Sequence, residues 1–157
     1  MPQVESRKPR RVGQKPRTAK SQAAWLFIDT TKSGEFRSGF LGQTVAVAAG
    51  LGRSNKFLSA LARRLTPQKL EALSGICVVA GPGSFTAVRT GVLVANLLAR
   101  LYGKPLCGVS VEESQDLKNL AERLLAGKVK SSTYVAPEYY AEPNITLKQP
   151  AGKTCYV

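Results

Sequence analysis

The residues with the clearest chemical potential form a glycine-rich turn, G-P-G-S-F-T, at residues 81–86. The turn follows a short apolar run at residues 76–80 and precedes a long one at residues 87–100, a pattern typical of a strand, a turn and a helix. In such a unit, backbone N–H groups and the positive helix end point toward whatever lies above the turn, often phosphate. The candidate phosphate-binding residues are Gly81, Gly83, Ser84, Thr86 and Arg89.

Known phosphate-binding motifs fit this turn poorly. A P-loop needs a Lys after its glycines, which is absent here. A dinucleotide fingerprint needs a third glycine where this chain has Ala87. The alternative interpretation is that the glycines allow strand and helix to pack closely, with Ser84 or Thr86 capping the helix. For Arg89 two interpretations stay open: the guanidinium binds a phosphate or a partner's carboxylate, or it reaches into solvent.

The sequence offers little for catalysis. The chain has ten acidic residues and no histidine, which excludes an H-E-x-x-H zinc site and the usual base for a Cys or Ser nucleophile. Cys77, Cys107 and Cys155 lack C-x-x-C spacing, and we interpret them as buried free thiols of a cytoplasmic protein. We expect no catalytic residue, no metal site and no autonomous enzyme activity.

Asp29 is the only acidic residue of the first apolar run, residues 24–30. A single carboxylate without a neighbouring acid does not make a metal site. We therefore expect Asp29 to form a turn, in which it accepts a hydrogen bond from Thr30 or Thr31.

The positive charge of the chain is concentrated at the N-terminus. The net charge is +13, and the first 20 residues carry seven basic side chains against Glu5 alone. This segment is poor in apolar residues and contains three prolines, so residues 1–22 are expected to be a disordered basic tail. Two interpretations stay open: the tail binds RNA through phosphate neutralisation, or it only keeps the chain soluble. The candidate tRNA-binding residues are Arg7, Lys8, Arg10, Arg11, Lys15 and Arg17.

The remaining chain predicts a single α/β domain. Apolar runs at residues 24–30, 35–42, 43–49, 76–80 and 106–109 read as five strands, and helical spacing is found at residues 54–65, 87–102 and 112–125. A short helix after Thr66-Pro67 is also expected. The main order βββαβαβα predicts a mixed five-stranded sheet of RNase-H-like type over residues 23–127. Residues 128–157, rich in proline, are expected to be extended. No apolar run is long enough for a membrane span.

Two of the expected helices are apolar over a broad stripe. The candidate interface residues on them are Phe57, Leu58, Leu61, Leu65, Val88, Val92, Ala95 and Leu97. A helix that is apolar on more than one face is buried either in its own core or against a partner. Periodicity alone leaves both interpretations open.

Residues 81–91, G-P-G-S-F-T-A-V-R-T-G, closely resemble the GPGSFTGxRxG signature of the bacterial TsaB (YeaZ) family. Residues 26–30 (L-F-I-D-T), 105–110 (P-L-C-G-V-S) and 137–140 (P-E-Y-Y) are similar to further segments of the family, in the same order. The family is glycoprotease-like and belongs to the actin/Hsp70 superfamily, whose members bind ATP between two RNase-H-like subdomains. This chain departs from the pattern at Ala87, where Gly is common, and at Arg53, where the family has His.

The resemblance implies a non-catalytic partner of a TsaD-like enzyme, which makes threonylcarbamoyladenosine on tRNA. It implies a heterodimer in which the two long apolar helices pair with their TsaD counterparts as a four-helix bundle; a homodimer in isolation and a TsaE-like ATPase are further expected partners. ATP and a metal are expected in the partner enzymes and not in this chain. Because about a hundred residues of the family's second subdomain have no counterpart, we expect a minimal or truncated form.

Overall fold

The structure, a computed structural model, describes residues 23–140. The predicted basic tail and its six candidate tRNA-binding residues lie outside the described residues, as do residues 141–157 with Cys155. The order of elements is β1 (Trp25–Asp29), β2 (Glu35–Leu41), β3 (Val45–Leu51), α1 (Ser54–Arg64), α2 (Pro67–Ala72), β4 (Gly75–Gly81), α3 (Phe85–Tyr102), β5 (Leu106–Ser110) and α4 (Leu117–Leu125). The short helix expected after Thr66-Pro67 is confirmed as α2, and the Thr66 side chain caps it by accepting from Lys69 N–H.

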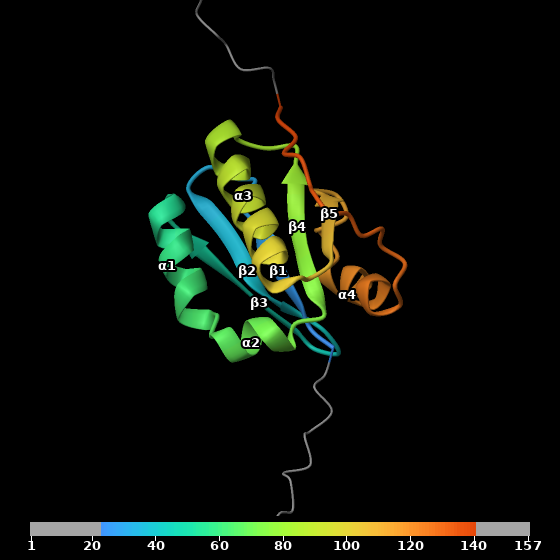
Figure 1. Ribbon diagram of the computed structural model, residues 1–157. Coiled ribbons are helices and arrows are strands. Elements are labelled where there is room, and N and C mark those ends of the chain that lie inside the picture. The colour runs from blue at the N-terminus through green and yellow to red at the C-terminus, as the bar shows by residue number, and fades with distance from the viewer. Residues whose placement is uncertain (1–22, 141–157) are drawn as a thin grey trace, which may run out of the picture.

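The five strands form one mixed sheet in the order β3-β2-β1-β4-β5 (Figure 1). β1, β2 and β3 form an antiparallel meander, and β4 and β5 continue it in parallel to β1. Each parallel connection passes through a helix, as crossovers in α/β proteins do. The predicted RNase-H-like α/β fold is confirmed.

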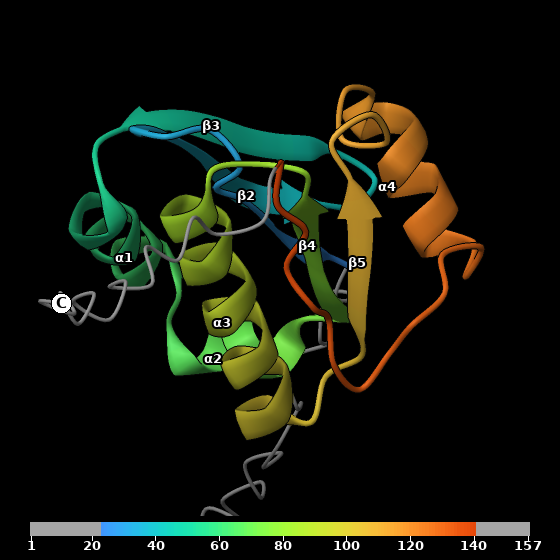
Figure 2. The ribbon, with the colours of Figure 1, turned by 90° about the horizontal axis from the view of Figure 1, so that it is seen from above.

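The helices cover the sheet on both faces. Figure 2 shows α1, α2 and α3 on one side and α4 on the other. The core is accordingly divided into two clusters, one around Phe57, Val88 and Val92 and the other around Leu120 and Leu124. All seven residues of β4 are buried, whereas β3 lies at the edge and is mostly exposed. A central strand covered on both faces needs the continuous apolar run that β4 has.

The predicted starts of three elements were wrong by two residues or more. β3 begins at Val45 and not at residue 43, because residues 42–44 form the bend between β2 and β3. α4 begins at Leu117 and not at residue 112: Ser110 N–H donates to Glu113 Oε2, which holds a non-helical turn, and the Asp116 carboxylate then caps the helix by accepting from Asn119 N–H. α3 begins two residues early, at Phe85.

Candidate functional site

The Asp29 carboxylate lies at the carboxyl end of the central strand β1. Its Oδ1 accepts hydrogen bonds from Thr31 N–H at 2.9 Å and from Thr31 Oγ1 at 2.8 Å, which confirms the predicted turn. Its Oδ2 accepts two bonds from Arg37, from Nε at 2.8 Å and from Nη2 at 2.6 Å. Both carboxylate oxygens are therefore engaged within the chain.

Arg37 also binds the loop between β5 and α4. Its guanidinium also donates to Ser114 O at 3.2 Å and to Ser114 Oγ at 2.8 Å, and it lies 5.6 Å from the centre of the Phe27 ring. Neither Arg37 nor Ser114 was predicted from the sequence as part of this cluster. The β1–β2 register, which places Asp29 opposite Arg37, is the signal that could have found Arg37.

The glycine turn packs against neighbouring backbone. Gly81 has φ +130°, a conformation that side chains rarely adopt, and a Cβ there would meet the backbone of Glu138. A Cβ at Gly83 would meet Thr31 O and the side chain of Val88. These contacts support the packing interpretation for both glycines, while phosphate binding at the turn stays a prediction.

Neither long helix begins with a side-chain cap. Ser84, one of the two predicted caps, is the N-cap residue of α3, but its side chain makes no capping hydrogen bond. Arg53 is the N-cap residue of α1, again without a side-chain cap. Ser54 Oγ instead lies 3.1 Å from Thr90 Oγ1 of α3, so the two hydroxyls connect the beginnings of the helices.

A cavity of about 380 Å³ lies where α1 and α3 begin. Its lining includes hydroxyl groups of both helix starts and two basic side chains that the sequence analysis did not select. These residues are Lys32, Arg53, Ser54, Ser84, Thr86 and Thr90. Of the predicted phosphate-binding residues only Ser84 and Thr86 line it. Arg89 is exposed on α3, with its guanidinium 5.9 Å from the centre of the Phe85 ring.

The predicted partner-binding residues fall into two groups. Phe57, Leu61, Val88, Val92 and Ala95 are at most 4% exposed and pack in the core beneath α1 and α3. They stabilise this domain and are not accessible to a partner in this conformation. Leu65 is half-buried, whereas Leu58 and Leu97 are 44% and 53% exposed.

The exposed apolar surface of α3 is larger than predicted. Leu93 and Leu101 are 65% and 67% exposed, and with Leu97 they follow each other at four-residue spacing. At 3.6 residues per turn this spacing places all three on the side opposite the buried Val88, Val92 and Ala95. We call Leu93, Leu97 and Leu101 the leucine row. The four-residue spacing could have identified Leu93 and Leu101 from the sequence.

Two cysteines lie side by side on neighbouring strands of the sheet. Cys77 of β4 and Cys107 of β5 are register partners, and both are buried and free. Burial, with the Cys107 thiol as a lesser cause, strongly raises the pKa of Cys77, and burial raises the pKa of Cys107. Because the thiolate is the nucleophilic form, both residues are unreactive structural thiols.

The described residues, 23–140, contain no group of three or more Cys, Asp or Glu residues that is arranged to hold a metal ion. No helix in this part of the chain has the length and apolar character needed to cross a membrane.

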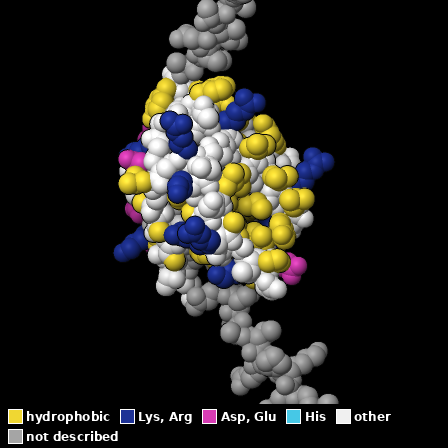
Figure 3. Space-filling view, turned by 90° about the vertical axis from the view of Figure 1, so that its left-hand side faces the viewer, with side chains coloured by type: hydrophobic (Ala, Val, Ile, Leu, Met, Phe, Trp, Pro, Cys, Tyr) yellow, Lys and Arg dark blue, Asp and Glu magenta, His cyan; other side chains and the backbone are white. Residues whose placement is uncertain are grey.

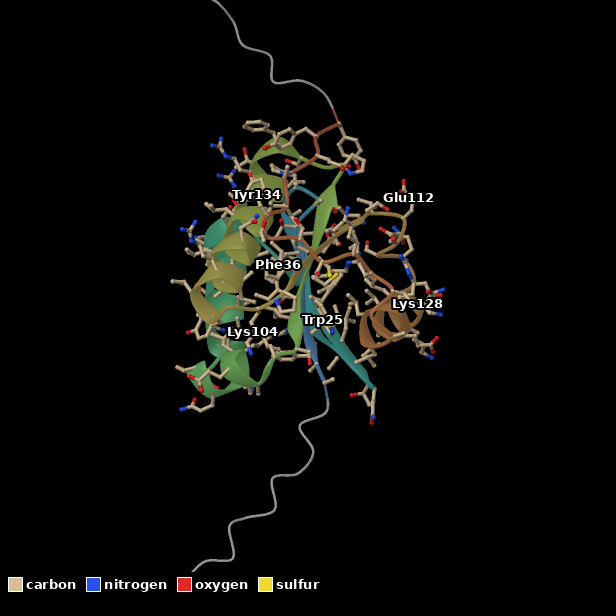
Figure 4. The ribbon with its side chains drawn as sticks, turned by 45° about the vertical axis from the view of Figure 1, so that its right-hand side comes forward. Trp25, Phe36, Lys104, Glu112, Lys128 and Tyr134 are labelled. Carbon is tan, nitrogen blue, oxygen red and sulfur yellow. The ribbon has the colours of Figure 1, made fainter. Side chains whose placement is uncertain are left out.

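Figure 4 shows how the last described segment completes the domain. Residues 128–140 leave α4 at Lys128 and pass Tyr134 beside α3. Asn96 of α3 binds both backbone groups of Val135, donating to its carbonyl at 2.9 Å and accepting from its N–H at 3.0 Å. Tyr139 lies next to Gly83, and its ring centre is 4.6 Å from that of Phe85. The glycine turn is thus partly covered by its own chain.

Comparison with known proteins agrees with the motif. Residues 55–124, which contain α1 except its first residue, the glycine turn and α3, match the family model of TsaD, tRNA N6-adenosine threonylcarbamoyltransferase. This segment is similar to the TsaD family. The resemblance inferred from the G-P-G-S-F-T segment is therefore confirmed.

Solved structures of similar proteins include YeaZ from Pseudomonas aeruginosa, with 25% sequence identity and a TM-score of 0.49. A second is an uncharacterised protein with similarity to the peptidase YeaZ from Pseudomonas aeruginosa, with 24% identity and a TM-score of 0.49. Each match covers 56% of this chain and 43% of the solved chain. No curated protein matches this chain.

Proposed function

We propose that this protein is a catalytically silent partner of a TsaD-like enzyme in the formation of threonylcarbamoyladenosine on tRNA. The observation that supports the proposal is the leucine row, which lies on the outward side of α3 within the segment that matches the TsaD family model. Large apolar side chains that face away from their own core are stabilised by a second apolar surface.

Helix α1 also exposes an apolar side chain. Leu58 of α1 is also exposed, and Figure 3 shows hydrophobic side chains gathered in a band on one side of the face that it presents. Two neighbouring helices with exposed apolar side chains form a surface suited to another helical pair. The helix-bundle contact implied by the TsaB resemblance fits this surface, with the exposed Leu58 and Leu97 as the predicted residues that would contact the partner.

The polar residues support a silent role. Both oxygens of Asp29 are engaged by Thr31 and Arg37, and the buried thiols of Cys77 and Cys107 are held protonated. In the proposal the TsaD-like enzyme carries ATP and the metal and transfers the threonylcarbamoyl group, and a TsaE-like ATPase is a further partner. This chain contributes the surface that stabilises that enzyme.

The test is complex formation between the full chain and the TsaD-like protein of the same genome, measured by size-exclusion chromatography. Leu97→Asp is expected to abolish the complex, because a carboxylate would be buried in an apolar contact. Leu125→Asp is the matched control: Leu125 is 39% exposed on α4, on the other face of the sheet. Leu61→Asp is unsuitable because Leu61 is in the core. Absence of a complex with the unaltered chain, or equal binding by Leu97→Asp, would overturn the proposal.

A second candidate function is phosphate or nucleotide binding, which the cavity with Lys32 and Arg53 favours. The beginnings of two helices line the same cavity, and helix N-termini attract anions. ATP is then expected to raise the melting temperature of the isolated chain, and Arg53→Ala to remove the shift. No shift at millimolar ATP would rule out this function for the chain alone.

A further inference from the structure

The leucine row has a different neighbour on each side. Thr90, Val94 and Leu98 follow each other at four-residue spacing along one side of α3, and Thr90 Oγ1 contacts Ser54 of α1. Val94 and Leu98 are half-buried against the core cluster beneath both helices. This side of α3 therefore faces α1 and adjoins the leucine row.

The other side of α3 faces residues 128–140. Asn96, which binds Val135, lies there. Arg89 is seven residues before Asn96 and Arg100 is four residues after it, so helical spacing places both arginines on the same side. Both are exposed. The leucine row is thus bordered on this side by two guanidinium groups.

The border on the α1 side is basic as well. Lys56, Ser59 and Arg63 follow each other at three- and four-residue spacing and are exposed, whereas Phe57 and Leu61 between them are buried. Lys56 and Arg63 therefore lie on the outward side of α1. Figure 3 shows Lys and Arg side chains next to the hydrophobic band. We call Lys56, Arg63, Arg89 and Arg100 the basic border.

Within residues 23–140, no ion pair neutralises the charge of this surface. Between residues 53 and 104 the chain has eight basic side chains and a single acidic one, Glu71. In the part of the chain that the structure describes, the ion pairs are Lys32–Glu35, Arg37–Asp29 and Arg123–Glu113, none of which involves these eight. The acidic residues of the 112–122 segment belong to the β5–α4 region, on the other face of the sheet.

We propose that the leucine row and its basic border bind an amphipathic helical surface of another protein whose apolar side chains are bordered by carboxylates, and not a second copy of this chain. The inference rests on the proposed function and specifies the chemistry of the partner. In a two-fold dimer the same surface faces itself, which would bring two basic borders together without counter-charges. An acidic border on the partner converts that repulsion into attraction and speeds association.

Sedimentation of the full chain tests whether a second copy of the chain binds this surface. At low ionic strength the unaltered chain is expected to be monomeric at micromolar concentration, because like charges on the two surfaces are then screened least. A dimer that is stable at low salt and lost in Leu97→Asp would overturn the choice of occupant.

Designed peptides test the chemistry directly. One helical peptide carries leucines at four-residue spacing with Glu on both borders, and its counterpart carries Lys at the same positions. The Glu peptide is expected to bind at least about ten-fold more tightly at low salt, and Arg89→Glu/Arg100→Glu to reverse the preference. Lys118→Glu/Lys128→Glu changes the net charge equally on exposed residues of the α4 side and is expected to leave the preference unchanged. Equal binding of both peptides would overturn the inference.

The salt dependence of binding to the TsaD-like protein tests this inference separately from the proposed function. Its affinity for the chain is expected to fall about ten-fold or more between low and high salt, with little salt dependence left in Arg89→Glu/Arg100→Glu. A complex that is insensitive to salt and to this charge reversal overturns the inference and leaves the proposed function intact. Absence of that complex, with preferential binding of the Glu peptide, overturns the proposed function and retains the inference.

Discussion

Asp29 and Arg37 connect three parts of the polypeptide. Asp29 ends β1, Arg37 lies opposite it in β2, and the Arg37 guanidinium reaches Ser114 in the loop before α4. The Asp29 side chain is 9% exposed and that of Arg37 is 32% exposed. A paired carboxylate at this depth is stable only while its partner remains, because an uncompensated buried charge is costly.

Arg37→Ala is therefore expected to lower the free energy of unfolding by about 3 kcal/mol. The loss has two sources, the unpaired Asp29 carboxylate and the missing bonds to Ser114. Urea denaturation measures the loss. Arg89→Ala, at an exposed position, is the control and is expected to change stability by less than about 0.5 kcal/mol.

A double variant checks the mechanism of this prediction. Asp29→Asn removes the charge that Arg37 neutralises, so the two substitutions together are expected to cost clearly less than the sum of the single ones. Additive losses would mean that Arg37 stabilises the fold mainly through Ser114 or its packing on Phe27.

Sequence reasoning at the residue scale succeeded where the partner is local. The Asp29 turn involves a residue two positions away, and side-chain chemistry alone predicts it. The pairing with Arg37 requires the register of the hairpin, and the contact with Ser114 spans 77 positions. Such contacts depend on how the elements pack, which residue types do not specify.

At the scale of the elements, the two sides of α3 have different roles. Its inward side packs on β4 through Val88, Val92 and Ala95, and its outward side carries the leucine row. Gly91 lies on the inward side, directly against Thr30 at the end of β1. The Thr30 hydroxyl in turn donates to Ala87 O at 2.7 Å. A glycine here permits a close approach of helix and strand that a larger residue would prevent.

Gly91→Ala is expected to destabilise the protein by up to about 2 kcal/mol. Alanine favours the helix by about 1 kcal/mol over glycine, but its Cβ would collide with a Thr30 side chain that is fixed by its hydrogen bond, and overpacking costs about 1–3 kcal/mol. Thermal and urea unfolding measure the net effect. Adding Thr30→Ala makes room, so the double variant is expected to recover part of the stability lost by Gly91→Ala. Stabilisation by Gly91→Ala alone would contradict the close approach.

The elements themselves were largely predictable, and their ends were less so. The strands and long helices were recognised because their apolar periodicity is strong, as in the wholly apolar β4. The start of α4 was not, because the Glu113 and Ser114 side chains bind nearby backbone and hold a turn where spacing alone suggests a helix. Periodicity also could not tell which apolar side of α3 faces the sheet.

At the scale of the whole molecule, residues 128–140 act as a strap across the α3 side of the sheet. Val135 is 8% exposed and packs on Gly108 of β5. The strap makes backbone bonds to β5, from Ser132 N–H to Leu106 O at 2.7 Å, and to β4, from Glu138 N–H to Ala80 O at 2.7 Å. The sequence predicted an extended segment here from its prolines, but not that it closes the domain.

Ending the chain after Gly127 is therefore expected to lower the free energy of unfolding. The shortened chain loses the packing of the buried Val135 side chain. It also loses the four hydrogen bonds that the strap makes to Asn96, Leu106 and Ala80. The helices and strands are all retained in the shortened chain, so circular dichroism is expected to show a folded protein with a lower urea midpoint.

The matched control ends after Tyr140, which keeps the strap and removes only the residues beyond it. This chain is expected to unfold at the same urea concentration as the full protein. A point variant then locates the effect: Asn96→Ala leaves both backbone groups of Val135 without their partner and is expected to reproduce a large part of the loss. If the chains ending at 127 and at 140 unfolded together, the strap would be only a surface segment, and the domain would be complete at α4.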